Sequence, residues 1–142
     1  MGYQSERQLI ETRFQTLWVD GVGGPLTPVA YDKQTTDNFE AADDPWVRIR
    51  IMSGYGERIT VGAPGNNGKR HAGVLAVQIN TLVGTGSEES RALADKLEPM
   101  FQNVLVENIR FDVPYPADEE VINGRWSSWT IFCPFTRDEY NA

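Results

Sequence analysis

The sequence predicts an α+β fold, in which a mainly antiparallel β-sheet carries two α-helices on one face. Two segments, residues 5–18 and 88–101, repeat apolar side chains at helical spacing. Several other segments alternate apolar and polar residues as strands do, and glycine-rich turns and long polar loops separate them. The expected order is α-β-β-β-α-β-β, and at 142 residues we expect a single domain over residues 1–142.

The first helix is expected over residues 5–18. Ser5 and Gln8 have the spacing of a capping box, in which each side chain satisfies a backbone N–H at the helix start. A single apolar stripe follows, formed by Ile10, Phe14, Leu17 and Trp18. The next residues, DGVGGP, favour the end of a helix.

Three strands are expected next. The short segment TPVAYD precedes a long polar stretch, KQTTDNFEAADDP, and the segment PWVRIRIM then shows the clearest alternation in the chain. Val47, Ile49 and Ile51 would face one side of the sheet, and Arg48 and Arg50 the other. The glycines of GYG at 54–56 predict a turn, and GVLAVQINTLV predicts the longest strand.

The segment APGNNGKRHAG at 63–73 superficially resembles a phosphate-binding loop. That motif requires glycine where Ala63 stands and a hydroxyl where Arg70 stands, followed by a helix. A strand pattern follows instead, so the segment is interpreted as a hairpin tip in which Asn66, Asn67 and Gly68 supply the turn.

The second helix is expected to begin after Ser87, a good N-cap, with Leu93, Leu97, Met100 and Phe101 as its buried stripe. Pro99 is expected to distort or break its last turn. Two final strands, NIRFDVP and RWSSWTIFCPF, would be joined by an acidic turn, YPADEEVING. Trp129, Ile131, Cys133 and Phe135 share one face of the last strand.

Composition excludes several kinds of site. The net charge of −7 argues against sequence-independent binding of nucleic acid. A single cysteine, Cys133, and a single histidine, His71, exclude multi-cysteine and multi-histidine metal sites. The acidic runs at 43–44 and 118–120 are interpreted as solvated turns. We therefore expect no catalytic residue, metal or cofactor, and no apolar run reaches the ~20 residues of a membrane span.

The face that carries Arg48 and Arg50 beside Trp46 is a candidate protein interface, with a solvated outer sheet face as the alternative. Arginine and tryptophan are enriched where proteins bind one another. Apolar residues on both faces of the last strand, with Phe132 opposite its neighbours, also predict cover on both sides.

The order of these segments resembles tail terminator (tail completion) proteins of long-tailed bacteriophages. TPVAYD…DNF, PWVRIRI, the hairpin closing at Gly73, VGTGSEESRALADKLEPMF and WTIFCPFTRDE follow one another as in that family, over nearly the whole chain. Each motif is weak by itself, and their order and spacing carry the resemblance.

The resemblance implies a structural virion protein without catalysis, made in the host cytoplasm and located at the head-proximal end of the tail. Subunits would form a hexameric ring that caps the tail tube, stops its polymerisation and offers a surface for joining the head. Its partners would be further copies of itself, the tail tube protein and the head–tail connector protein, with the tape measure protein a further candidate, and DNA would only pass through the lumen.

In such a ring the subunit and tube contacts would lie on loops and sheet edges, here residues 33–44 and 62–71. With the arginine face, this gives a set of candidate contact residues: Phe39, Trp46, Arg48, Arg50, Asn66, Asn67, Lys69, Arg70 and His71. Two alternatives stay open, another head–tail connector or neck protein, and a small hydrolase or ligand-binding enzyme that uses His71 and Cys133.

Overall fold

The computed structural model describes residues 2–21, 26–31, 44–58, 68–84, 88–122 and 124–140. Its helices are α1 (Tyr3–Phe14), which continues as the π-helical segment η1 (Gln15–Val19), and α3 (Glu88–Phe101). Its strands are β1 (Val29–Ala30), β2 (Trp46–Arg58), β3 (Gly68–Leu82), β4 (Leu105–Val106), β5 (Ile109–Phe111), β6 (Tyr115–Ile122) and β7 (Trp126–Tyr140). The predicted α+β class and element order are confirmed, with β4 and β6 as additions.

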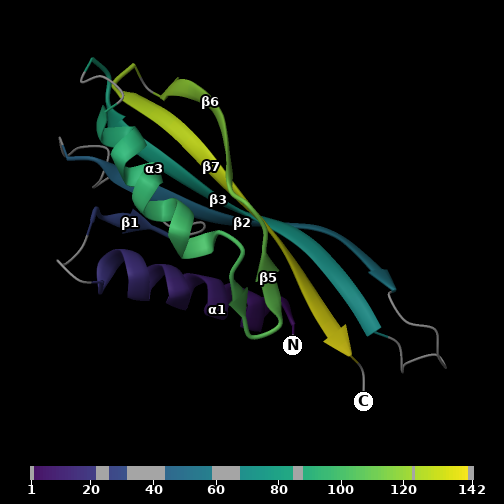
Figure 1. The fold of residues 1–142 in the computed structure, drawn as a ribbon. Coiled ribbons are helices and arrows are strands. Elements are labelled where there is room, and N and C mark those ends of the chain that lie inside the picture. Colours follow the sequence, from purple (N-terminus) through teal and green to yellow (C-terminus); the bar gives the residue numbers. More distant parts are fainter. Residues whose placement is uncertain are drawn as a thin grey trace.

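The strands form one seven-stranded sheet in the order β1-β2-β3-β7-β5-β4, and β6 pairs with β7 beside β5. Every pair is antiparallel except β1 with β2. Helices α1 and α3 both lie on the same face of this sheet, as predicted (Figure 1). The far ends of β2, β3 and β7 form a three-stranded arm, residues 53–58, 68–73 and 134–140, whose base contacts β5 and the start of α1 and whose tip extends beyond the two helices (Figure 1).

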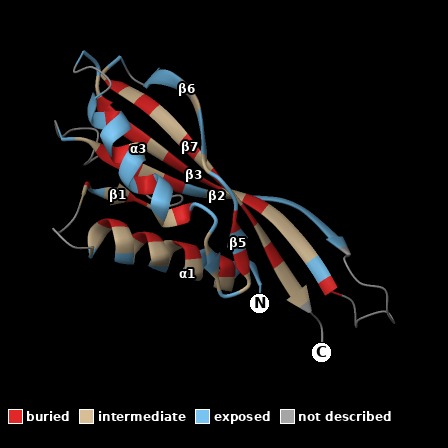
Figure 2. Ribbon diagram, viewed as in Figure 1, coloured by how far each residue is buried: buried red, intermediate tan, exposed pale blue. Residues whose placement is uncertain are grey.

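The main core fills the space between the helices and the sheet (Figure 2). Buried positions alternate along most of β7, whereas β3, in the middle of the sheet, is buried on both faces over residues 75–77 and 79–81. The helices contribute Ile10, Phe14, Trp18, Leu93, Leu97 and Phe101, and the central strands contribute Val47, Ile49, Leu75, Val77, Ile79, Ile131, Cys133 and Phe135. The helical stripes and the strand alternation read from the sequence are therefore confirmed. Four predicted members of these faces, Leu17, Ile51, Met100 and Trp129, are only half-buried, and Leu17 lines a groove with Val106.

The first helix begins at Tyr3 rather than after Ser5, so the predicted capping box is wrong. Gly2 is the N-cap and no side chain caps the helix. The Cζ atom of Arg137 lies 5.3 Å from the centroid of the Tyr3 ring. The Tyr3 and His71 rings also contact each other in a T-shaped arrangement. These tertiary contacts favour a helical Tyr3, and Ser5 consequently lies inside the first turn.

The turn expected at 54–56 is instead an irregularity within β2. The strand continues to Arg58, and its register with β3 shifts between Ser53 and Gly56. A Cβ on Gly54 would lie 2.8 Å from the carbonyl oxygen of Ala72, so glycine allows the two backbones to approach closely. The predicted hairpin between β2 and β3 is confirmed, whereas its turn residues Asn66 and Asn67 lie outside the described part of the chain.

The expected acidic turn at 115–124 is also wrong for most of its length, because Tyr115–Ile122 form strand β6. This strand pairs with β7 alone, so it lies at an edge of the sheet. Glu119 and Glu120 are exposed there. Charged side chains are typical of edge strands, where they oppose pairing with other chains.

Pro99 does not break the second helix, which continues to Phe101. The Phe101 ring stacks on Phe14, with 6.2 Å between centroids, and meets Phe111 edge-on at 5.0 Å. Burial of this ring between three elements holds the last turn in place despite the missing proline N–H. The predicted cap Ser87 lies outside the described residues.

Candidate assembly interface

The sheet face opposite the helices is assembled by the register of three long strands. Arg48 of β2 pairs with Gln78 of β3, which pairs with Thr130 of β7. One row further, Arg50 pairs with Ala76, which pairs with Phe132. Because side chains alternate across a sheet, all of these point away from the core residues that pack under the helices.

A groove of about 310 Å³ lies on this face. We call it the arginine groove, and its lining residues are Arg48, Arg50, Met52, Ala76, Gln78, Glu120, Thr130 and Phe132. Arg48 is half-buried and Arg50 is exposed. Within the described residues neither guanidinium has a hydrogen bond or an ion pair, in contrast to Arg7, Arg70 and Arg137.

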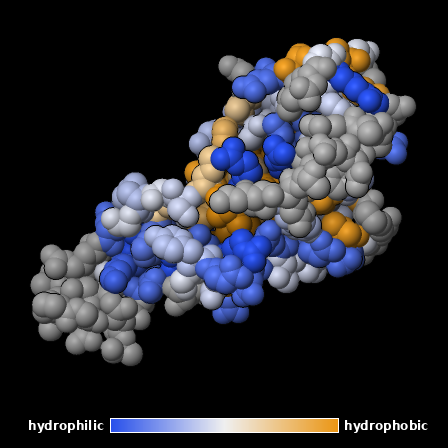
Figure 3. Space-filling model, turned by 180° about the vertical axis from the view of Figure 1, so that it is seen from behind, coloured by the Kyte–Doolittle hydropathy of each residue, from blue (hydrophilic) through white to orange (hydrophobic). Residues whose placement is uncertain are grey.

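Two further features lie in or beside the arginine groove. The Oε1 atom of Gln78 is buried and accepts no hydrogen bond from the described residues, so a donor from outside would satisfy it. The rings of Tyr115 and Phe132 lie 5.5 Å apart at the groove's edge, and Tyr115 is half-exposed. Hydrophilic and hydrophobic side chains lie close together on this side of the molecule (Figure 3).

The structure buries Trp46, which the sequence offered as an interface residue. Its side chain is only 2% exposed and packs edge-on against Trp126, with 6.0 Å between ring centroids. With Ala30 these tryptophans form a second, smaller core on the sheet face opposite the helices. The large apolar area of the ring favours this burial, so within one subunit Trp46 leaves little surface for a partner.

Lys69, Arg70 and His71 lie on the arm, where they belong to strand β3 rather than to the loop expected at 62–71. Arg70 makes two hydrogen bonds to Asp138, from Nε at 2.8 Å and from Nη2 at 3.1 Å. His71 Nε2 is 3.6 Å from Glu139 Oε2, and Lys69 is exposed. Six positions along β3 separate Arg70 from Ala76 of the arginine groove, about 20 Å in a strand.

Other predicted contact residues cannot be placed. Phe39, Asn66, Asn67 and all of the segment 33–44 except Asp44 lie outside the described residues. The structure therefore brings Arg48 and Arg50 together in one groove, places Lys69, Arg70 and His71 in a separate cluster on the arm, and buries Trp46.

An ion-pair network that no sequence pattern indicated ties the arm to the first helix. Arg137 of β7 donates from Nε to Glu6 Oε1 at 3.0 Å and from Nη1 to Glu139 Oε2 at 2.8 Å. Burial alone would lower the pKa of Arg137, but its hydrogen bonds to Glu139 and Glu6 and their negative charges raise it. Glu6 and Arg137 are separated by 131 positions, which is why local periodicity gave no signal.

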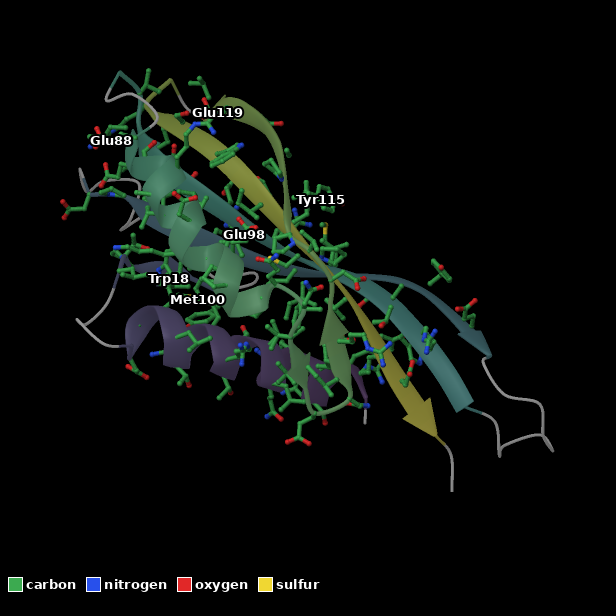
Figure 4. All side chains as sticks on the ribbon, viewed as in Figure 1. Trp18, Glu88, Glu98, Met100, Tyr115 and Glu119 are labelled. Atoms are coloured by element: carbon green, nitrogen blue, oxygen red, sulfur yellow. The ribbon has the colours of Figure 1, made fainter. Side chains whose placement is uncertain are left out.

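Unpaired carboxylates lie on the other face of the molecule. Asp95 and Glu98 are exposed on α3 and line a groove of about 360 Å³ between that helix and β6. Figure 4 shows Glu98 on α3 and Tyr115 at the start of β6, both of which line this groove. Neither carboxylate has an ion pair with a described residue.

The structure does not bring His71 and Cys133 together. His71 pairs with Arg137 and Cys133 with Leu75, so four positions, about 13 Å of strand, separate them. Burial raises the pKa of Cys133 to about 12, which keeps the thiol protonated at neutral pH. A nucleophilic cysteine requires the opposite shift, so this pair lacks the features of a catalytic dyad.

Within residues 2–21, 26–31, 44–58, 68–84, 88–122 and 124–140, no three His, Cys, Asp or Glu side chains gather as metal ligands. In the same part of the chain, no helix has the length and apolar character needed to cross a membrane.

Comparison with known proteins supports the resemblance read from the sequence. Eleven chains of solved structures match, among them one that is 16% identical and that aligns over 96% of this chain and 98% of its own length with a TM-score of 0.65. At that identity the likeness shows the fold alone. No curated protein matches the sequence. The family model described as phage tail terminator protein matches residues 7–114, which is most of the chain. The chain belongs to the phage tail terminator protein family and is a structural component of a bacteriophage tail.

Proposed function

We propose that this tail protein assembles into a hexameric ring that caps the tail tube, ends its polymerisation and offers the surface to which the head joins. The ring would lie at the head-proximal end of the tail. Family membership supports a role in ending the tail, and the arginine groove supports self-association. The observation that carries the ring is the pair of unpaired guanidiniums at Arg48 and Arg50, on a sheet face that neither helix covers.

Two adjacent guanidiniums that form no ion pair repel each other, and one carboxylate in the groove lining, that of Glu120, does not balance both charges, so their arrangement becomes favourable when a partner supplies further carboxylates. The chain as a whole is acidic, so further copies of itself are a ready source of such carboxylates. The same acidity suits a ring through which DNA slides, because a negative lumen does not bind phosphates.

The proposed contacts divide between two regions. The arginine groove would face another subunit, whereas the arm with Lys69, Arg70 and His71, together with Phe39, Asn66 and Asn67, would contact the tail tube protein, the head–tail connector protein or the tape measure protein. No catalytic group is needed for any of these contacts.

The test combines light scattering with electron microscopy. Purified protein should scatter as a discrete oligomer and appear as rings in micrographs. When mixed with polymerising tail tube protein, it should bind tube ends and arrest their growth, so that tube length falls as the ratio of this protein rises. A strict monomer at high concentration with unchanged tube length would overturn the proposal. Binding to the head-side component without any effect on tube length would instead assign a head–tail connector.

A further inference from the structure

We propose that the arginine groove of one subunit receives the carboxylates of Asp95 and Glu98 from α3 of the next subunit. This inference rests on the proposed ring and specifies which two surfaces form it. The ring by itself requires only that copies of the chain associate, whereas this contact names the residues on both sides.

A two-fold contact of the arginine groove with a second copy of itself is unfavourable. It would gather four guanidiniums, from Arg48 and Arg50 of both copies, around the axis, and the groove lining offers only the two Glu120 carboxylates against them. A head-to-tail contact therefore remains, in which the groove meets a different surface of the next copy. Contacts of this kind generate rings when the rotation between subunits closes.

Two carboxylates of α3, those of Asp95 and Glu98, combine a position on the opposite side of the molecule with the absence of an ion pair to any described residue. Glu6 and Glu11 of the first helix are already paired with Arg137 and Arg7. Glu120 lines the arginine groove itself, so it cannot be the distant partner of a head-to-tail contact. Asp95 and Glu98 lie on the opposite side of the sheet, on a helix that packs against its other face.

The helix gives these carboxylates a further reason to bind cations. The C-terminal end of a helix carries partial negative charge, which disfavours acidic side chains and favours basic ones. Glu98 lies in the last turn of α3, and that turn has no basic residue. Arg13 of α1 already donates to the Met100 carbonyl oxygen at this end, so an incoming guanidinium would act on the Glu98 carboxylate.

The spacing of the two pairs is compatible. Alternate residues of a strand, such as Arg48 and Arg50, are about 7 Å apart. Side chains three positions apart on a helix, such as Asp95 and Glu98, have Cβ atoms about 5–6 Å apart. The flexible arginine side chains span the difference, and each guanidinium can bind one carboxylate with two hydrogen bonds.

The surroundings of both pairs add apolar contact. Phe132 and Met52 line the arginine groove, and Trp129 lines the groove beside α3. Arg91 also lines that second groove, but its guanidinium lies over the Trp129 ring, 5.2 Å from the centroid, rather than on a carboxylate. The two carboxylates thus stay available to a neighbour's arginines.

The test reverses the charge of each surface separately. R48E/R50E would set acidic groups against acidic groups between copies, and D95R/E98R would set basic against basic. Each variant alone should need about a tenfold higher concentration, or more, to assemble than wild type. An equal mixture of the two variants should assemble again, because every contact between unlike chains is then complementary. R7E/R110E, which reverses two arginines outside the groove, matches the net charge of R48E/R50E and should assemble like wild type.

Sedimentation velocity gives the assembly state, and circular dichroism confirms that each variant is folded. The neutral variant R48Q/R50Q repeats the test with smaller perturbation and should also weaken assembly. If either reversed variant assembles normally alone, or if the folded mixture stays monomeric, this contact is wrong while the ring still stands. If wild type itself remains monomeric under all conditions, the proposed ring fails and this contact fails with it.

Discussion

Arg137 and Glu6 form a buried ion pair that joins the last strand to the first helix, with 3.0 Å between Nε and Oε1. The Arg137 side chain is 1% exposed and that of Glu6 is 4% exposed. The Tyr3 ring covers the guanidinium, and Glu139 accepts its second hydrogen bond. The base of the arm therefore depends on a charged group that has no access to water.

Removal of the arginine should strongly destabilise the protein. Arg137→Ala leaves the Glu6 carboxylate buried without a counter-charge, which costs about 3–5 kcal/mol of the free energy of unfolding. The exposed pair of Arg7 and Glu11 provides a matched control, and Arg7→Ala should cost less than about 1 kcal/mol. Urea denaturation of both variants measures the difference. Equal costs would show that the buried pair contributes no more than an exposed one.

Acid should weaken the end of the arm through Asp138. Its hydrogen bonds from Arg70, and then the positive charges of Arg70 and Arg110, outweigh burial and lower the pKa of this carboxyl. Because its pKa is lower in the folded state, Asp138 stabilises the fold at pH values above its unfolded-state pKa of about 3.9. This stabilisation is lost as the pH falls through the folded-state pKa.

The comparison with Asp138→Asn tests this effect. The difference in free energy of unfolding between wild type and D138N should be largest above about pH 5 and should shrink as the pH falls below about 4. Denaturation by urea at a series of pH values measures it, and D112N controls for the loss of one negative charge. A difference that stays constant over this range would mean that the carboxylate does not interact with Arg70.

Local patterns in the sequence predicted the parts of the fold that depend on local periodicity. The stripe of the first helix and the alternation around Ile49 require only that one face of each element be buried. The strand β6 was missed because its acidic residues read as a turn, and only its neighbour β7 makes them an edge strand. The sequence predicted too short a β2, because a glycine fits a turn as well as a strand. Only the close approach of Gly54 to Ala72 shows that the strand continues there.

Only part of the candidate interface could be predicted, because the rest depends on contacts between residues far apart in the sequence. Alternation placed Arg48 and Arg50 on one face, but which residues from β3 and β7 join them depends on strand register. Trp46 shares that face, yet contact with Trp126, eighty positions away, buries it. Such distant pairings leave no mark on a single sequence.

A side chain at Gly73 should destabilise the protein. A Cβ there would lie 2.6 Å from Cζ of Phe135, its register partner on β7, and 3.0 Å from the carbonyl oxygen of Met52. Gly73→Ala should therefore cost about 1–3 kcal/mol of the free energy of unfolding, because the buried Phe135 ring must shift. Thermal and urea denaturation measure the loss.

A second substitution separates this clash from a general effect of alanine in a strand. Phe135→Leu removes the atom that the new methyl would meet, so the double variant should lose less than the sum of the two single losses. Gly2→Ala, where nothing lies within 4 Å, should leave stability nearly unchanged. If the two losses add strictly, the cost of G73A does not come from contact with the Phe135 ring.

Cys133 should be inert in the folded protein and should react only when the sheet opens. The side chain is fully buried between β7 and the helices, and burial raises its pKa to about 12. Thiol reagents attack the thiolate, so two barriers, the lack of access and the lack of charge, protect the sulfur at pH 8. Ellman's reagent should therefore label native protein far more slowly than protein in urea, with a labelling rate that follows the equilibrium of opening. The Gly73→Ala variant should accelerate labelling of the native protein in proportion to its loss of stability. The reason is that Gly73 of β3 packs on Phe135, which lies two positions from Cys133 on β7. Rapid labelling of the native wild type would contradict both the burial and the raised pKa of Cys133.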